Sequence, residues 1–266
     1  MIRFLKGKLI DLSKITPDFF FLFIVNLFCL ITSRKLKFSR NNKFWICSDY
    51  NLNYDIKFLH KSRLFLYING IQHRLNILSQ QYLLSNINFN KNDVVIDCGA
   101  NIGELGIFFK INYPNVDYFS FEPSKKEFEC LKENLSDFGV HQNVALWNKK
   151  EILNFFINSP SADSSLIEPI KYSETNSVQG LRLDSFDFKK IRLLKLEAEG
   201  AEPEIIEGSE GIINMTDIVT ADLGFERGKN SESTIAPVSK FLTKNNFFIS
   251  EIYPQRLIVK FEKNNL

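Results

Sequence analysis

An acid and two glycines stand between two apolar runs in residues 94–109, VVIDCGANIGELGIFF. Asp97, Gly99 and Gly103 fall where a buried strand is expected to turn into a helix. A glycine lets the backbone approach a ligand closely and adopt positive φ, because it has no Cβ. The helix that follows points unpaired N–H groups at the same place, which favours a carboxylate or a phosphate. The stretch therefore predicts a ligand site at a strand–helix turn.

The spacing of the glycines separates two classes of nucleotide site. A dinucleotide fingerprint reads G-x-G-x-x-G, and its middle glycine admits a pyrophosphate. This chain reads D-x-G-x-x-x-G, with Ala100 and Asn101 inside the turn. The order resembles the first motif of class I S-adenosylmethionine (SAM) methyltransferases, in which the turn holds the methionine part of SAM. An NAD-dependent oxidoreductase is the alternative that the spacing disfavours.

A second acid, Glu122, ends the next predicted strand, residues 117–121. A carboxylate at that position can accept hydrogen bonds from both hydroxyls of a ribose. Asp97 or Glu122 alone would be an ordinary acid at a strand end. Together with the spaced glycines and the strand–turn–helix–strand order, the two acids favour a SAM-type nucleotide site.

Strands and helices alternate around this site from residue 93 onward. The expected strands are 93–98, 117–121, 140–146, 152–157, 191–196 and 217–223, and the expected helices are 102–111, 124–138, 203–213 and 234–245. This alternation predicts an α/β, Rossmann-like class I methyltransferase fold, with a central, mostly parallel, seven-stranded sheet and helices on both faces. The last two segments, 247–253 and 257–261, would form an antiparallel pair at one edge of the sheet.

Residues 1–85 lack this alternation and are predicted to form an N-terminal extension to a methyltransferase domain at 86–266. The extension is expected to contain an apolar helix at 15–33, a hairpin, since Arg63–Ile68 is followed by Asn-Gly, and a helix at 72–86, packed on the core. Within the second domain, residues 158–179 are rich in Ser, Asn and Pro. They predict a long loop, either a lid over the site or a plain surface excursion.

The apolar run Phe19–Ile31 has two interpretations. As a helix it spans about 20 Å, short of the roughly 30 Å hydrocarbon layer of a bilayer. The first interpretation is a helix packed on the body of the protein. The second is a peripheral membrane helix, with basic residues on both sides attracted to anionic lipid. No small-residue cleavage site follows the run, so a cleaved signal peptide is not expected.

Composition disfavours several classes of protein. The formal net charge is only +2, with basic and acidic residues mixed along the chain, which argues against a nucleic-acid partner. The four cysteines form no CxxC pair and the three histidines are scattered, so no zinc or disulfide framework is expected. These features predict a cytoplasmic protein, with membrane association as the alternative.

Six segments in this order resemble the FkbM-type methyltransferases: VVIDCGANIGE, FEPSKKEFECLKENL, NVALWNKKE, RLDSF, LLKLEAEGAEPEIIEGSEGII and ADLGFERG. The resemblance covers roughly residues 60–261. It implies SAM as the cofactor and methylation mostly of oxygen, frequently on sugars or polyketide-like natural products. The cofactor-binding residues would be Asp97, Gly99, Ala100, Asn101, Gly103, Glu122 and Ala145. One departure is Glu197, which stands where the family usually carries Asp and leaves the geometry there open.

A charged run marks the end of the strand at 191–196. Lys195, Glu197 and Glu199 would share one face if the strand continued, and the next strand brings Asp222 to the same edge. These candidate catalytic residues could raise the pKa of one acid into the range of a base, or hold a divalent cation with a diol acceptor. The structural alternative is that Lys195 is ion-paired inside the sheet edge and Glu199 shapes a turn. His141 lies at the start of a strand and is interpreted as structural.

The sequence therefore predicts a SAM-dependent methyltransferase acting on a small polar or glycan acceptor, such as a sugar of a surface polysaccharide. The substrate class depends on the resemblance alone. The alternative is a SAM-binding protein without catalysis that serves as a partner in glycan assembly.

Overall fold

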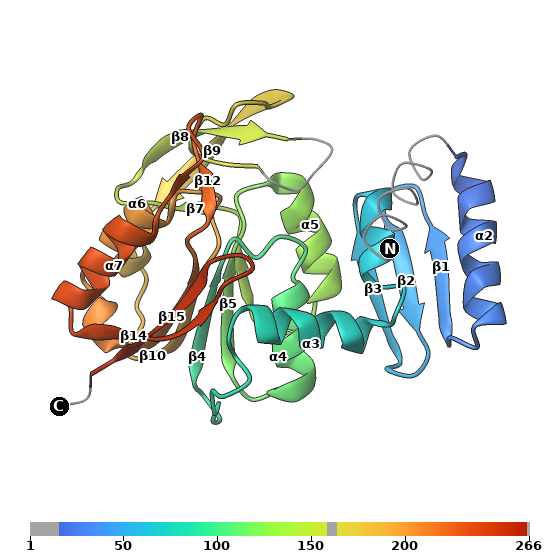
Figure 1. The fold of residues 1–266 in the computed structure, drawn as a ribbon, viewed down its shortest axis with the longest axis horizontal. Helices are drawn as coiled ribbons and strands as arrows, with labels where there is room; N and C mark the ends of the chain where they lie inside the picture. Colours follow the sequence, from blue (N-terminus) through green and yellow to red (C-terminus); the bar gives the residue numbers. More distant parts are fainter. Residues whose placement is uncertain (1–15, 159–163, 265–266) are drawn as a thin grey trace. The chain divides into compact units, whose positions relative to one another are not determined.

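The computed structural model describes residues 16–158 and 164–264 of the 266-residue chain. The chain divides into two compact units, Met1–Ile77 and Leu78–Leu266. The division falls inside helix α3 (Ile71–Gln81), earlier in the chain than the predicted boundary after residue 85. Figure 1 labels the elements of both units.

In the first unit, an apolar helix packs on a small antiparallel sheet. The elements are α2 (Asp18–Ile31), β1 (Leu36–Arg40), β2 (Trp45–Asp49) and β3 (Tyr54–Phe58), and the strands lie in that order. Phe21, Val25 and Cys29 are buried at four-residue spacing, which places them on one face of the helix. The Asn26 amide pairs with the backbone of Phe38, donating to its carbonyl at 2.8 Å and accepting from its N–H at 2.7 Å. One face of α2 is therefore fixed against β1.

The hairpin predicted at Arg63–Ile68 is wrong. Lys61–Leu66 forms a 3₁₀ helix, η1, in which Leu64 is fully buried. A short apolar run fits a helix or a strand equally well, so its periodicity could not distinguish them. The antiparallel strands of this unit lie earlier, at residues 36–58, where the sequence predicted no element.

The second unit contains a seven-stranded sheet. Its strands are β4 (Val94–Cys98), β5 (Asp117–Phe121), β6 (Val140–Gln142), β10 (Ile191–Leu196), β11 (Thr216–Asp222), β14 (Phe247–Tyr253) and β15 (Ile258–Lys263). The order is β14-β15-β11-β10-β4-β5-β6. The five strands from β11 to β6 are parallel, and β15 pairs antiparallel with both β11 and β14. This confirms the predicted mostly parallel sheet with an antiparallel final pair.

Helices flank this sheet, as Figure 1 shows. They are α4 (Glu104–Asn112), α5 (Lys125–Asn134), α6 (Glu202–Glu207) and α7 (Ile235–Lys244), with the short turns η2 (Leu183–Ser185) and η3 (Ile213–Met215). Nearly every residue of β10 is buried, which is typical of a strand covered on both faces. Leu194 and Val219 from the strands join Ile205 and Val238 from the helices in one core.

Residues 158–179 are only partly a loop, and residues 159–163 lie outside the described ranges. β9 (Glu174–Leu181) pairs with β8 (Glu151–Ile157) and with β7 (Ala145–Leu146) in a separate small sheet. The strand predicted at 140–146 is therefore two strands, β6 and β7, in two different sheets. The lid interpretation stays a prediction. After β11, the strands β12 (Phe225–Arg227) and β13 (Glu232–Ser233) form a short ribbon.

Candidate functional site

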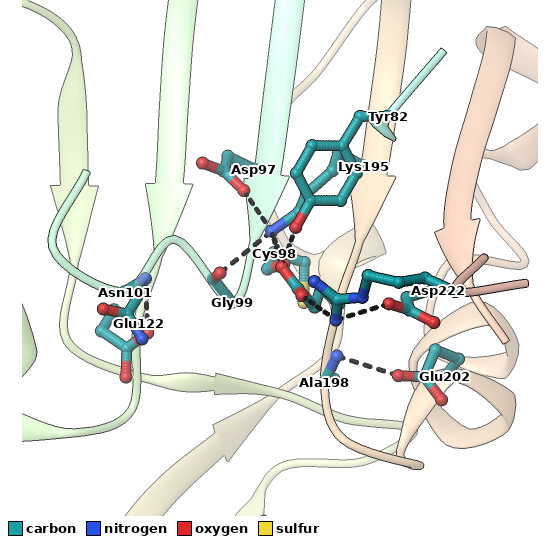
Figure 2. Close-up of polar contacts among 12 residues, drawn as sticks. Tyr82, Asp97, Cys98, Gly99, Asn101, Glu122, Lys195, Ala198, Glu202 and Asp222 are labelled. Carbon is teal, nitrogen blue, oxygen red and sulfur yellow. Dashed lines mark hydrogen bonds and ion pairs between the residues drawn. The ribbon is translucent and has the colours of Figure 1, made fainter. Parts of the chain in front are cut away.

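The glycine turn and Glu122 lie together at the carboxyl ends of β4 and β5. The N–H of Gly99 donates to the carbonyl of Phe121 at 3.0 Å. One carboxylate oxygen of Glu122 accepts from the N–H of Asn101 at 2.8 Å, and the other accepts from the N–H of Ser124 at 2.8 Å. Figure 2 shows Asn101 and Glu122 side by side. The adjacent parallel strands thus bring the turn and the second acid to one place.

The chain segment that follows β10 requires a glycine at position 99, whether or not a ligand is bound. Its φ is 73°, and a Cβ there would lie 1.8 Å from the carbonyl oxygen of Glu197. The sequence predicted that a ligand would come close to this glycine, whereas in the structure the backbone of Glu197 already does. Gly103 has a φ of 86° and begins α4, and a Cβ there would lie 2.9 Å from Leu135, just after α5. Asn101, at φ 51°, is a residue type that tolerates the left-handed region.

Lys195 is buried beneath the turn, where it is 2% exposed. Its Nζ lies 2.9 Å from Asp97 Oδ1 and donates to the carbonyls of Cys98 at 3.1 Å and Gly99 at 3.0 Å. The Tyr118 hydroxyl donates to the other oxygen of Asp97. Burial alone would lower the pKa of Lys195, but the Asp97 charge raises it above its usual value. These contacts favour the structural alternative, in which Lys195 supports the turn.

A second group of charges lies beyond the ends of β10 and β11. Arg256, in the turn between β14 and β15, places Nη2 2.8 Å from Glu197 Oε1 and 2.7 Å from Asp222 Oδ2. The same nitrogen lies 3.8 Å from Glu226 Oε1, on β12. The Tyr82 hydroxyl donates to the second oxygen of Glu197. Glu197 is therefore held by a cation and a hydroxyl, while Glu226 stands at a longer distance from the same cation.

The acids of this group are predicted to titrate differently. Burial would raise the pKa of Glu197, but Lys195 and Arg256 together lower it to about 2. Burial raises the pKa of Asp222. Burial and the nearby Asp222 charge raise the pKa of Glu226 to about 7. The cluster thus combines an acid that stays ionised with one that can take up a proton near neutral pH.

Glu199 does not continue the strand, so the condition for sharing a face with Lys195 and Glu197 is not met, and the alternative, a turn at Glu199, is what the structure shows. β10 ends at Leu196, and Glu199 has a φ of 50°. The alternation of an extended strand stops at such a turn. The Glu199 carbonyl accepts from the Ser165 hydroxyl at 2.8 Å. Lys195 and Glu197 do meet, at 3.4 Å between Nζ and Oε2.

Four polar residues of the site were missed by sequence reasoning: Tyr82, Glu202, Glu226 and Arg256. Glu202, at the start of α6, accepts from the N–H of Ala198 at 2.8 Å and from the Thr234 hydroxyl at 3.1 Å. It therefore fixes the backbone after β10. Glu226 lies within ADLGFERG, so that segment could have pointed to it. No local spacing marks Tyr82 or Arg256, since each reaches the site from a distant part of the chain.

The other predicted cofactor residues are alanines, whose polar contacts are made by the backbone: the N–H of Ala100 donates to the carbonyl of Phe121 at 3.2 Å. Ala145 is buried in β7 and pairs with Gly180. Nearby, the Asn143 side chain donates to the Glu122 carbonyl at 2.8 Å, so this segment borders the second acid. The role of Ala145 in cofactor binding stays a prediction. His141 is half-buried, with Nδ1 2.7 Å from the Ser120 hydroxyl, and burial lowers its pKa.

Within residues 16–158 and 164–264, no group of three or more His, Cys, Asp or Glu side chains is arranged to hold a metal ion. Glu197 and Asp222 instead direct carboxylate oxygens at Arg256. The structure gives no support to the divalent-cation interpretation of the charged run.

The sheet order, the glycine turn and the adjacent acid are those of the class I methyltransferase fold. The model of the methyltransferase FkbM domain family matches residues 97–248, which include the turn, Glu122 and the acids of the charged cluster but not Arg256 or Tyr82. The match covers more than half of the chain, and the chain belongs to this family.

Individual relatives are more distant. Methyltransferase 1 of Beauveria bassiana (strain ARSEF 2860) is 26% identical over 148 residues, which cover 45% of this chain and 59% of that protein. The 31-O-demethyl-FK506 methyltransferase FkbM of Streptomyces tacrolimicus is 38% identical over 53 residues, 20% of either chain. The crystal structure of methyltransferase FkbM from Methylobacillus flagellatus KT matches with a TM-score of 0.51 and 13% identity, covering 76% of this chain and 54% of that one. It shows the same fold. In each match the chain spans less than two thirds of its relative.

Proposed function

We propose that this methyltransferase binds SAM at the carboxyl ends of β4 and β5 and methylates a hydroxyl oxygen of a small polar acceptor, such as a sugar. The observation that carries the proposal is the 2.8 Å hydrogen bond from the Asn101 N–H to Glu122, which joins the glycine turn to the second acid. In open α/β sheets, ligands bind at this end of the strands. The S. tacrolimicus relative, by its name a methyltransferase for 31-O-demethyl-FK506, supports an oxygen acceptor.

The residues present fit an adenosyl amino acid. Glu122 is 6% exposed, and burial raises its pKa to about 7. Burial disfavours the charged form of this carboxylate. Two ribose hydroxyls that donate hydrogen bonds to it would stabilise that form. Lys195 holds the carbonyls of Cys98 and Gly99, so the turn is preformed for the amino-acid part of the ligand. Bound SAM supplies an electrophilic methyl group.

Glu226 is the proton acceptor in this proposal. Its Oε2 is buried and has no hydrogen-bond partner among the described residues. Its Oε1 is 3.8 Å from Arg256, beyond hydrogen-bond distance. A carboxylate with a pKa of about 7 can accept a hydroxyl proton near neutral pH. Glu197 and Asp222 hold Arg256 in place and so fix the electrostatic surroundings of Glu226.

Calorimetric titration with SAM and S-adenosylhomocysteine tests the cofactor site. Glu122→Ala should weaken binding by about tenfold or more, because it removes hydrogen bonds to a charged group. Glu210→Ala, which removes an exposed acid, is the matched control and should leave the affinity unchanged. Equal affinities for the two variants would contradict the ribose role of Glu122. NAD binding in place of SAM would support the oxidoreductase alternative.

Transfer of a radiolabelled methyl group from SAM into glycan extracts and free sugars tests the reaction. Glu226→Gln should retain the affinity for S-adenosylhomocysteine and reduce transfer by about 10²- to 10⁴-fold, as expected for the loss of a general base. Unreduced transfer would assign the proton to another group. Tight S-adenosylhomocysteine binding with no transfer to any acceptor would support the alternative of a SAM-binding partner protein without catalysis.

A further inference from the structure

The two units carry opposite formal charges. Residues 1–77 contain 13 Lys and Arg but only 4 Asp and Glu, a formal charge of +9. Because the whole chain carries +2, residues 78–266 carry −7. Along the sequence the charges look mixed, but the unit boundary separates them. The first unit is therefore expected to be attracted to anionic surfaces.

The outer face of α2 is apolar and exposed. Eight large apolar side chains of this helix are exposed: Phe19, Phe20, Phe23, Ile24, Leu27, Phe28, Leu30 and Ile31. The exposed fractions of Phe19, Leu30 and Ile31 are 83%, 75% and 74%. The helix has no charged residue after Asp18. A contiguous apolar patch of this kind marks an interaction surface, since lone exposed apolar residues are ordinary but a whole helix face is not.

The charges beside this face indicate which partner covers it. Lys35 and Lys37 are exposed just after the helix, and the Arg34 guanidinium lies 4.9 Å from the centre of the Phe28 ring. A cavity of about 450 Å³ is lined by Arg34, Lys35 and His73, together with the acid Asp49, two leucines and small or uncharged polar residues. Apolar contact on the helix and cations at its end match the acyl and phosphate regions of a lipid surface.

The other candidate partners fit less well. Two copies of this unit would each carry a formal charge of +9, so they would repel one another. A nucleic acid would satisfy the cations but leave the apolar face uncovered.

We propose that α2 and the basic residues that follow it bind the surface of a bilayer that contains anionic lipids. The 14 residues of α2 are too few to cross the hydrocarbon layer, and no helix in the described ranges is long and apolar enough to do so. The helix therefore lies in the plane of the interface, with Phe19, Phe23 and Leu30 towards the acyl chains.

Co-sedimentation of the full chain with vesicles tests the apolar part. The native protein should bind vesicles of phosphatidylcholine mixed with phosphatidylglycerol, and added salt should weaken the binding. Phe19→Ser/Phe23→Ser/Leu30→Ser should reduce binding by about tenfold or more, since it removes apolar side chains that would enter the interface. The control Ile152→Ser/Ile170→Ser/Phe248→Ser removes three exposed apolar side chains of the second unit and should bind like the native protein. Circular dichroism checks that both variants remain folded.

Charge reversal tests the electrostatic part. Lys35→Glu/Lys37→Glu should reduce binding to the anionic vesicles on the order of tenfold or more and leave the weaker binding to pure phosphatidylcholine unchanged. Lys240→Glu/Lys244→Glu makes the same change of charge on exposed residues of α7 and should have little effect. Equal effects of the two pairs would overturn the proposal, as would a native protein that does not sediment with anionic vesicles. A native dimer that the triple α2 variant converts to a monomer in light scattering would assign the face to a second copy instead.

Discussion

The two units of this FkbM-family protein differ in where they place polar and apolar side chains. The second unit buries charges: Asp97, Lys195 and Asp222 are each 2% exposed or less, and Figure 2 shows them at the ends of the central strands. The first unit leaves the apolar outer face of α2 exposed. Both arrangements limit the stability of the fold. Buried ions lose their hydration, and an exposed apolar face contributes no hydrophobic free energy to folding. Features of this kind persist where they serve function, and they agree with the two different binding surfaces that we propose for the two units.

The largest expected difference between the units concerns two glycines with positive φ. A Cβ at Gly99 would lie 1.8 Å from the backbone oxygen of Glu197, whereas a Cβ at Gly70 would lie 3.1 Å from a side-chain oxygen of Asp49, so the second contact needs a displacement of only a few tenths of an ångström. Gly99→Ala should lower the free energy of unfolding by about 4 kcal/mol or prevent folding. Gly70→Ala should lower it by about 1 to 2 kcal/mol. Urea denaturation followed by circular dichroism measures both, and equal losses would break the comparison.

Two lysines give the next largest expected difference. Lys195→Met leaves Asp97 buried without its cation and should lower the free energy of unfolding by about 3 kcal/mol. Lys61, in the first unit, lies 3.0 Å from the partly exposed Asp18 and 4.7 Å from the centre of the Phe21 ring. Lys61→Met should lower the free energy of unfolding by about 1 kcal/mol, since a solvated ion pair contributes little. A larger loss for Lys61→Met in the same denaturation assay would show that the first unit also depends on a buried charge.

The smallest expected effect is a pH dependence from Glu122. Its pKa is about 7 in the folded chain and about 4.3 when unfolded. Because the folded pKa is raised, the contribution of Glu122 to the free energy of unfolding is fully present below about pH 4.3 and is lost as the pH rises through 7. Glu122→Gln cannot ionise, so its unfolding free energy relative to the native protein should rise by about 2 kcal/mol from pH 5 to pH 7. Denaturation curves at a series of pH values measure this rise.

Glu197 provides a second test, because its contribution to the free energy of unfolding should change with pH in the opposite direction to that of Glu122. Its folded pKa of about 2 means that its stabilising contribution is present above about pH 4.3 and is lost as the pH falls through 2. Glu197→Gln should therefore be less stable than the native protein at neutral pH and approach it under acid conditions. Parallel pH profiles for the native protein and both variants would contradict the opposite roles of the two acids.

The sequence was most reliable where short-range pattern decides the structure. The strand before Gly99, the strand before Glu122 and the antiparallel final pair follow from periodicity and turn residues within a few positions. The prediction was wrong at Arg63–Ile68, where a short apolar run could not distinguish a 3₁₀ turn from a strand. At Glu199 the sequence left a continued strand and a turn open; the structure shows a turn just after β10, held by Glu202 and Ser165. Of these two residues, Ser165 comes from a distant part of the chain, where no local pattern points to it.

The sequence by itself determined the α/β class, the family and the position of the glycine turn with its second acid, because each depends on residue types at fixed short separations. Only the tertiary structure decided that Lys195 supports the turn, that Arg256 and Tyr82 hold Glu197, and that the outer face of α2 is left exposed. Side chains distant in the sequence meet only after the strands align, and their burial and charge depend on that meeting.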